Sequence, residues 1–215
     1  MFHPTTVDPA TPRAVRAFIS QVTDVYLADI HAMLRLPRPE LNITEACNFS
    51  IVAVLMNAIS GVSVVLYEPP PNRQATGRKF VETARDFYPW DAEPLGALTN
   101  AGECAEILYS SFRNPMAHAF GFQDPEPVGA LSVTRFPGPG LAEADLEGIE
   151  TSLRRPTETL RGASTLVRDP TTQALSLNVE SFYWGVRELL RRLTANVGRM
   201  AAAEAHLSPM LRTAR

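Results

Sequence analysis

Hydrophobic residues recur at helical spacing through the first half of the chain. Between residue 12 and Leu34, apolar side chains return every three or four positions, which predicts a long amphipathic helix. Thr11 is the expected N-cap, and Pro12 suits the first helical position because its missing N–H would be unpaired there. Pro37 and Pro39 then end the helix.

The second apolar segment carries no charged residue from Phe49 to Tyr67. It is about as long as a helix that spans a bilayer, so a membrane anchor is one interpretation. Asn57 and Ser60 interrupt the segment, and its flanks lack the basic cluster and aromatic belt of a membrane helix. A helix that is apolar on every side is also what the centre of a soluble bundle requires. We therefore expect a core helix and no membrane contact.

Two shorter helices are predicted next, at residues 74–88 and 101–112. Asn100 stands immediately before the second of them, where its side chain can accept a hydrogen bond from the first turn. Asn114 and Pro115 then predict a restart of the helix, with Asn114 as its N-cap and Pro115 at its first position.

After about residue 122 the pattern changes to short alternating segments. We expect a mainly α fold, in which a helical bundle at 12–122 and a C-terminal extension at 123–215 form one structural unit. The extension combines a small β-hairpin or sheet with a long C-terminal helix. Its predicted elements are a strand at 128–136, an acidic helix at 142–153, a hairpin of 164–167 and 174–179, and a helix from Asn178 or Ser181 to about His206.

Composition limits the choice of function. The net charge of −3 gives no general attraction to nucleic acid, so any RNA contact must come from a local basic surface. Cys47 and Cys104 lie within apolar helical patterns and are expected to be buried thiols in a reducing compartment. The first 12 residues lack the pattern of a signal peptide. We expect a cytoplasmic protein without a metal or cofactor.

The segment with the clearest chemical potential places Arg113, Asn114 and His118 within six positions, among apolar residues. Arginine binds phosphate oxygens through a planar fork, histidine can transfer a proton near neutral pH, and asparagine can orient a phosphate or a ribose hydroxyl. Together they suit metal-free phosphodiester cleavage. A structural alternative is that His118 caps a turn in the core while Arg113 pairs with a carboxylate such as Glu106.

The sequence Arg113-Asn114-Pro115-Met116-Ala117-His118 resembles the signature of the HEPN superfamily, in which four to six residues separate an arginine from a histidine. The resemblance covers roughly residues 12–122. It implies a metal-independent endoribonuclease of toxin–antitoxin or defence type, with Arg113, Asn114 and His118 as catalytic residues. It further implies a homodimer whose two motifs form one composite site on RNA, and a possible antitoxin partner. Other members of the superfamily bind without catalysis, so a non-catalytic interaction or nucleotide-binding module is the alternative.

Three further residues are candidates for substrate binding. Tyr109 precedes Arg113 by four positions, so its phenol can lie beside the guanidinium on a helix and help to position a phosphate or stack a base. The alternative is an ordinary packed tyrosine. Arg187 and Arg191 lie off the apolar stripe of the last helix, where an arginine ridge could contact an RNA backbone. The ordinary alternative for that ridge is a solvated helix face.

Overall fold

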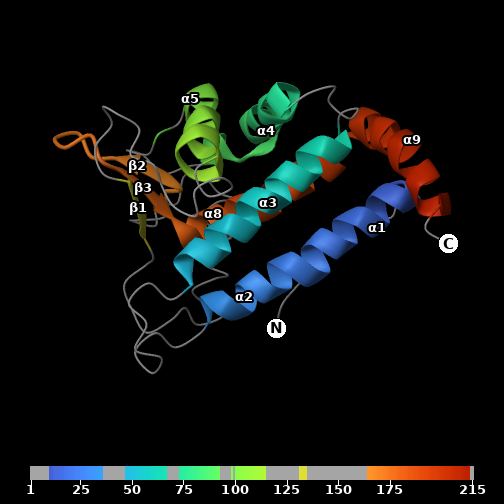
Figure 1. Ribbon diagram of the computed structural model, residues 1–215, viewed down its shortest axis with the longest axis horizontal. Coiled ribbons are helices and arrows are strands. Elements are labelled where there is room, and N and C mark those ends of the chain that lie inside the picture. The colour runs from blue at the N-terminus through green and yellow to red at the C-terminus, as the bar shows by residue number, and fades with distance from the viewer. Residues whose placement is uncertain are drawn as a thin grey trace.

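The protein is mainly helical and carries a small three-stranded sheet at one end (Figure 1). The computed structural model describes residues 10–35, 47–66, 73–92, 98, 100–114, 131–134 and 164–213. The predicted helix at 142–153, the segments on either side of the 122/123 boundary and His118 all lie outside these residues. Within them, the expectation of a mainly α fold with a small sheet is confirmed.

The first helix is continuous in space but changes its winding. Its parts are α1 (Arg13–Gln21), the π-helical η1 (Val22–Leu27) and α2 (Ala28–Leu34). Thr11 does not cap it, and the N-cap residue is Pro12. Instead Glu204, near the other end of the sequence, accepts hydrogen bonds from the backbone N–H groups of Ala14 at 2.8 Å and Val15 at 3.1 Å.

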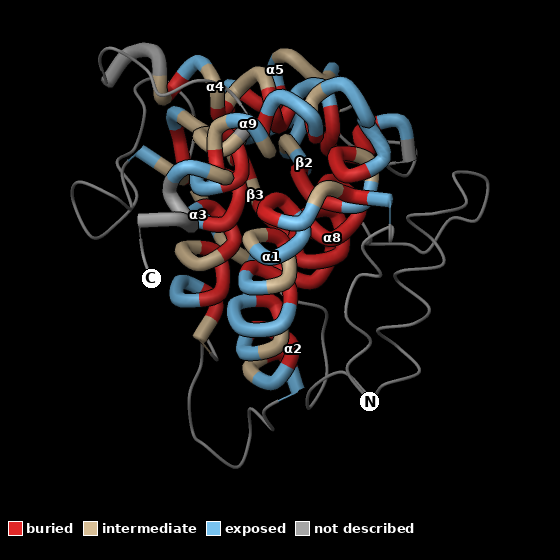
Figure 2. Tube along the Cα trace, turned by 90° about the vertical axis from the view of Figure 1, so that its right-hand side faces the viewer, coloured by how far each residue is buried: buried red, intermediate tan, exposed pale blue. Residues whose placement is uncertain are grey.

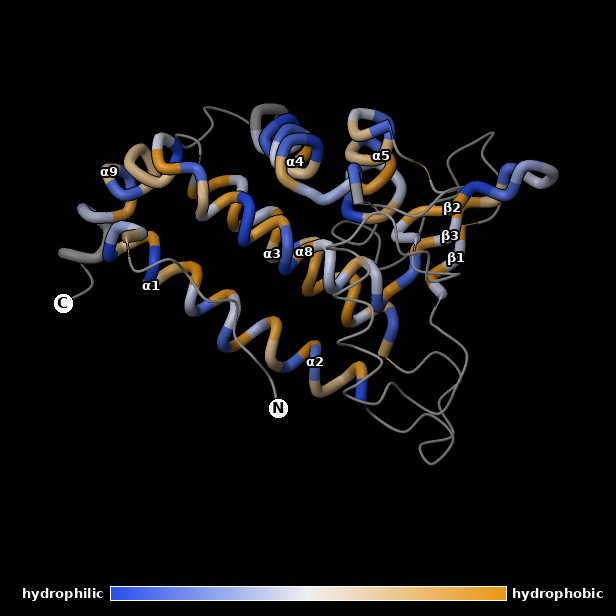
Figure 3. Tube along the Cα trace, turned by 180° about the vertical axis from the view of Figure 1, so that it is seen from behind, coloured by the Kyte–Doolittle hydropathy of each residue, from blue (hydrophilic) through white to orange (hydrophobic). Residues whose placement is uncertain are grey.

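The predicted core helix is α3 (Asn48–Leu66), which lies between α1–α2 on one side and α8 (Val179–Thr194) on the other (Figure 1). Hydrophobic positions recur along both α3 and α8 (Figure 3). By length and composition α3 could cross a membrane, but half of its most apolar 18-residue window is buried inside the protein.

Helix α8 is the centre of the core, and every residue from Val179 to Leu190 is buried (Figure 2). Of the two predicted start residues, Asn178 is the N-cap, and it accepts a hydrogen bond from the N–H of Ser181 at 2.9 Å. The single long C-terminal helix was a wrong prediction. The helix ends at Thr194, and α9 (Val197–Thr213) follows after a break at which Asn196 accepts from the N–H of Arg199 at 3.1 Å.

Helix α4 (Arg73–Phe87) packs against α3, α8 and α5 (Ala101–Ile107), and is followed by the short 3-10 turn η2 (Trp90–Ala92). Asn100 caps α5 as predicted, accepting from the N–H of Glu103 at 3.0 Å. The predicted hairpin is also confirmed. In the sheet, β3 (Leu175–Asn178) lies between antiparallel β2 (Leu166–Arg168) and parallel β1 (Leu131–Thr134).

One glycine allows α4 and α8 to meet closely. A Cβ at Gly185, in the middle of α8, would lie 2.5 Å from Cε2 of Tyr88 and still closer to its phenol end. The Tyr88 hydroxyl shares a hydrogen bond of 2.5 Å with the Thr165 hydroxyl. Because Tyr88 follows α4 and Thr165 precedes β2, this contact joins α4, α8 and the sheet.

Candidate functional site

The described part of the candidate motif lies in the helical segment that begins after Asn100. Helix α5 continues directly into the π-helical η3 (Leu108–Arg113), which makes Arg113 its last residue. Single π-helical turns recur at functional sites because they displace side chains from regular helical positions. Arg113 is partly buried and Asn114 is exposed.

The expected helix restart at Asn114 is not what the backbone shows. Asn114 has φ −67° and ψ −48°, which is right-handed helical geometry. An N-cap residue has extended backbone angles, so the prediction that Asn114 is an N-cap is wrong. The helix continues through the residue before Pro115, although that position usually disfavours helical geometry.

Arg113 is held by neutral groups. Its guanidinium carbon lies over the Tyr109 ring, 5.7 Å from the ring centroid, and its Nε donates a long hydrogen bond of 3.4 Å to the Ser60 hydroxyl of α3. In the part of the chain that the structure describes, no carboxylate forms an ion pair with Arg113, so the alternative pairing with Glu106 is not observed. Its positive charge is therefore not neutralised by these residues.

Tyr109 is seated against α4. Its ring lies 5.6 Å from that of Phe80, centroid to centroid, and its phenol end rests on Gly77, which has no side chain to displace it. Tyr109 is half-buried, and the predicted proximity of its ring to the guanidinium of Arg113 is observed. Arg113 and Tyr109 thus form a pair at the junction of α3, α4 and η3.

Arg187 of α8 is buried, so the predicted exposed ridge is wrong for this residue. Arg187 is 8% exposed, stacks 4.5 Å above the Trp184 ring and donates through Nη1 to the Tyr183 hydroxyl at 3.3 Å. The same hydroxyl lies 3.5 Å from Nδ1 of His31 on α2. Arg187 therefore belongs to a buried polar cluster and presents no surface to RNA.

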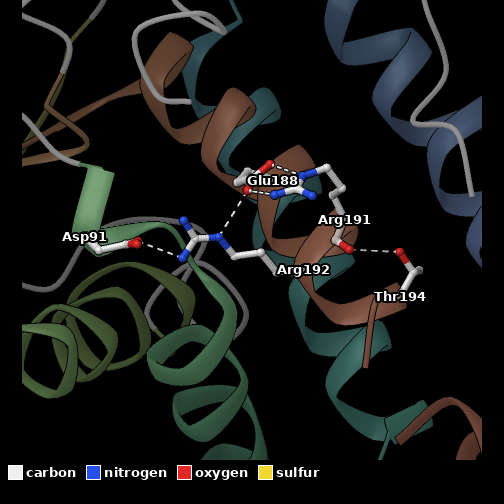
Figure 4. Close-up of polar contacts among 5 residues, drawn as sticks. All are labelled: Asp91, Glu188, Arg191, Arg192 and Thr194. Carbon is white, nitrogen blue, oxygen red and sulfur yellow. Dashed lines mark hydrogen bonds and ion pairs between the residues drawn. The ribbon is translucent and has the colours of Figure 1, made fainter. Parts of the chain in front are cut away.

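Arg191 is exposed and forms an ion pair with Glu188. Its Nε and Nη2 donate to the two carboxylate oxygens of Glu188 at 2.7 and 2.6 Å (Figure 4). Arg192 donates to Glu188 at 3.1 Å and to Asp91 of η2 at 2.7 Å, so the network joins α8 to the segment after α4. Because a bidentate carboxylate occupies its fork, Arg191 is a weaker candidate for phosphate than Arg113.

Burial alone would raise the pKa of the Glu188 carboxyl. Hydrogen bonds and attraction from Arg191 and Arg192 outweigh that effect, and the pKa lies below its ordinary value. The carboxylate is thus charged at neutral pH and holds both arginines. The network connects α8 to η2 through the bond from Arg192 to Asp91. The sequence already showed that Arg191 and Arg192 follow Glu188 by three and four positions, the spacing at which side chains meet on a helix.

A groove lies between the first helix and α3, with a volume of about 320 Å³. Phe18, Val22 and Tyr26 line one side, and α3 supplies mainly small residues on the other. Val25, which precedes the lining residue Tyr26 in the chain, is 50% exposed. The lining is apolar apart from one asparagine and one phenol, and Arg113 does not belong to it. This groove therefore does not suit an anion, and Arg113 is the better phosphate candidate.

Among the described residues, no group of three or more His, Cys, Asp and Glu side chains could hold a metal ion. Both cysteines are free thiols, with Cys104 buried and Cys47 half-buried. No protein-family model, curated protein or solved structure matches the chain.

Proposed function

We propose that the protein is a metal-independent endoribonuclease of HEPN type, which acts in the cytoplasm as a symmetric homodimer. The observation that carries the proposal is the surroundings of Arg113. A partly buried guanidinium that stacks on a tyrosine and has no carboxylate partner among the described residues is suited to a phosphate. The sequence adds a histidine five positions later.

In this mechanism Arg113 holds the scissile phosphate and stabilises the charge that develops on its oxygens. The ribose 2′-hydroxyl attacks the phosphorus, and the bond to the 5′-oxygen of the next nucleotide breaks. His118 accepts the proton of the attacking hydroxyl or donates one to the leaving oxygen. Asn114 orients the phosphate. The products carry a 2′,3′-cyclic phosphate and a 5′-hydroxyl, and no metal takes part.

Two copies are required because the reaction needs both a general base and a general acid. One chain supplies a single motif histidine, whereas two motifs across a two-fold axis supply both. A protein of this kind would act as a toxin or defence factor on RNA, and a cognate antitoxin protein would be its natural partner. The resemblance to the HEPN superfamily supports these assignments.

The test is cleavage of structured RNA in the presence of EDTA by the wild type and by Arg113→Ala and His118→Ala. Loss of one well-placed group from such a site lowers the rate by about 100-fold or more, so we expect both variants to lose cleavage. Arg78→Ala is the matched control, since Arg78 is an exposed arginine paired with Glu82 on α4. Unchanged cleavage by the Arg113 and His118 variants would overturn the proposal.

The second candidate function is a non-catalytic module that binds a nucleotide or RNA phosphate. The same observation favours it, since a guanidinium with no carboxylate partner among the described residues can bind phosphate without His118. Binding that Arg113→Ala abolishes, with no cleavage by the wild type and no effect of His118→Ala, would select this function.

A further inference from the structure

Helix α4 meets η3 at a position where a side chain cannot be accommodated. Gly77 is buried, and a Cβ built on it would lie 2.6 Å from Cζ of Tyr109 and still closer to the phenol oxygen. Real Cβ contacts are essentially never this short, so any residue other than glycine must displace the Tyr109 ring. Phe80, three residues further along α4, contacts the same ring at a centroid distance of 5.6 Å.

The ring placed in this way is the surface on which Arg113 stacks, with 5.7 Å between the guanidinium carbon and the ring centroid. Among the residues that the structure describes, Arg113 also donates the long hydrogen bond to Ser60. Of the two groups seen to hold this guanidinium in the described part of the chain, Tyr109 is the larger. An ion pair with a carboxylate would also orient it, but would neutralise the charge that a phosphate needs. Stacking on an aromatic ring orients the group and leaves its charge available.

We propose that Gly77 is a positioning residue of the phosphate site, which orients Arg113 through the ring of Tyr109. This inference rests on the proposed function in taking a phosphate as the ligand of Arg113. Glycine weakens the interior of a helix relative to alanine, so at most helical positions alanine would be the better residue. At Gly77 the space beneath Tyr109 gives a specific reason for glycine.

The first experiment compares Gly77→Ala with Gly61→Ala. The control makes the same change inside α3, one residue from Ser60, where the new Cβ would lie 4.0 Å from Cζ of Phe18 in ordinary contact. The Nε–H resonance of Arg113, assigned through its loss in Arg113→Lys, reports the ring current of Tyr109. We expect Gly77→Ala to shift this resonance in the same direction as Tyr109→Leu does, and Gly61→Ala to leave it in place.

The second experiment is a double-mutant cycle on RNA cleavage. In the wild-type background, we expect Gly77→Ala to lower kcat/KM about tenfold. In the Tyr109→Leu background, which lacks the ring, we expect Gly77→Ala to have no further effect on kcat/KM. If Gly77→Ala alone does not fold, the double variant is measured. Recovery of the fold in the double variant shows that the two positions conflict sterically, and its Arg113 resonance is then compared with that of Tyr109→Leu.

The outcomes separate the two proposals. An Arg113 resonance that Gly77→Ala leaves unmoved, or effects of the two substitutions that simply add, would overturn the positioning role. A resonance that moves as expected in a protein that cleaves no RNA would support the positioning role and reject the ribonuclease. In that case the tenfold loss is sought in the affinity for inorganic phosphate instead.

Discussion

Two tyrosine–arginine pairs with the same spacing have different surroundings in this protein. Tyr109 and Arg113 are four residues apart on η3, and Tyr183 and Arg187 are four apart on α8. In both pairs the guanidinium carbon lies over the ring, 5.7 Å from the centroid in the first and 5.9 Å in the second. The helix alone therefore brings each pair together.

What differs is the cover that the rest of the chain provides. Arg187 is enclosed by Trp184 and bonded to the Tyr183 hydroxyl, so its side chain is part of the core. Arg113 keeps solvent access, and its tyrosine rests on a glycine. The same local pair is thus a structural brace in one place and a candidate phosphate site in the other, and tertiary packing decides between them.

The largest expected effect is on the free energy of unfolding, and it distinguishes Arg187 from Arg113. Arg187→Ala removes a large buried side chain, which leaves a cavity and takes a hydrogen-bond donor from the Tyr183 hydroxyl. We therefore expect the free energy of unfolding to fall by about 3 kcal/mol. Arg113→Ala should cost less than about 1 kcal/mol, because its contacts are few and partly exposed. Urea denaturation measures both. Equal losses would mean that Arg113 is also a structural brace, and the comparison would fail.

The contrast also shows which features the sequence could predict. Asn100 and Asn178 were recognisable as N-caps because the cap interacts with residues two or three positions away. The apolar segment of α3 and the hairpin at residues 164–179 were predictable for the same reason, since their signals are local. The pairing of Tyr109 with Arg113 follows from one turn of helix.

The features that the sequence did not reveal depend on distant segments. Glu204 caps α1 from across the chain, and Gly77 meets Tyr109 through the packing of two helices. Arg187 was expected on a solvated face, but α8 is covered on all sides from Val179 to Leu190, so the polar positions in that stretch are buried as well. The break at Asn196 was missed because the apolar spacing continues from Leu193 through Val197 to Met200.

A smaller effect concerns the charged network of α8. The pKa of Glu188 is lowered in the folded protein, so this group stabilises the fold above the pKa of the unfolded chain. That contribution is lost as the pH falls below about 4.5, the ordinary value, and through the lower folded pKa. We expect Glu188→Gln to lower stability by about 2 kcal/mol at pH 7 and to flatten its acid dependence.

Urea denaturation between pH 7 and pH 3 measures this change. The control is Glu82→Gln, because Glu82 pairs on the surface of α4 with Arg78, whose side chain is 80% exposed. Such exposed pairs contribute about 0.5 kcal/mol or less. If the stability of Glu188→Gln followed the wild type at every pH, the network would not be the brace between α8 and η2 that its geometry indicates.

The smallest expected effect concerns Arg191, the exposed arginine of α8. Its guanidinium is bound by both carboxylate oxygens of Glu188, which an RNA phosphate would have to displace. Because Glu188 lies on the same helix, its carboxylate binds without the loss of translational and rotational entropy that an RNA ligand pays. We expect Arg191→Ala to change kcat/KM for RNA cleavage by less than about threefold, against about 100-fold or more for Arg113→Ala. The two variants remove the same charge, so their net-charge effects on RNA attraction cancel in the comparison. Arg191→Ala could instead abolish cleavage as fully as Arg113→Ala. An ion pair with a carboxylate would then not prevent an arginine from binding phosphate, and the absence of such a pair at Arg113 would no longer identify the site.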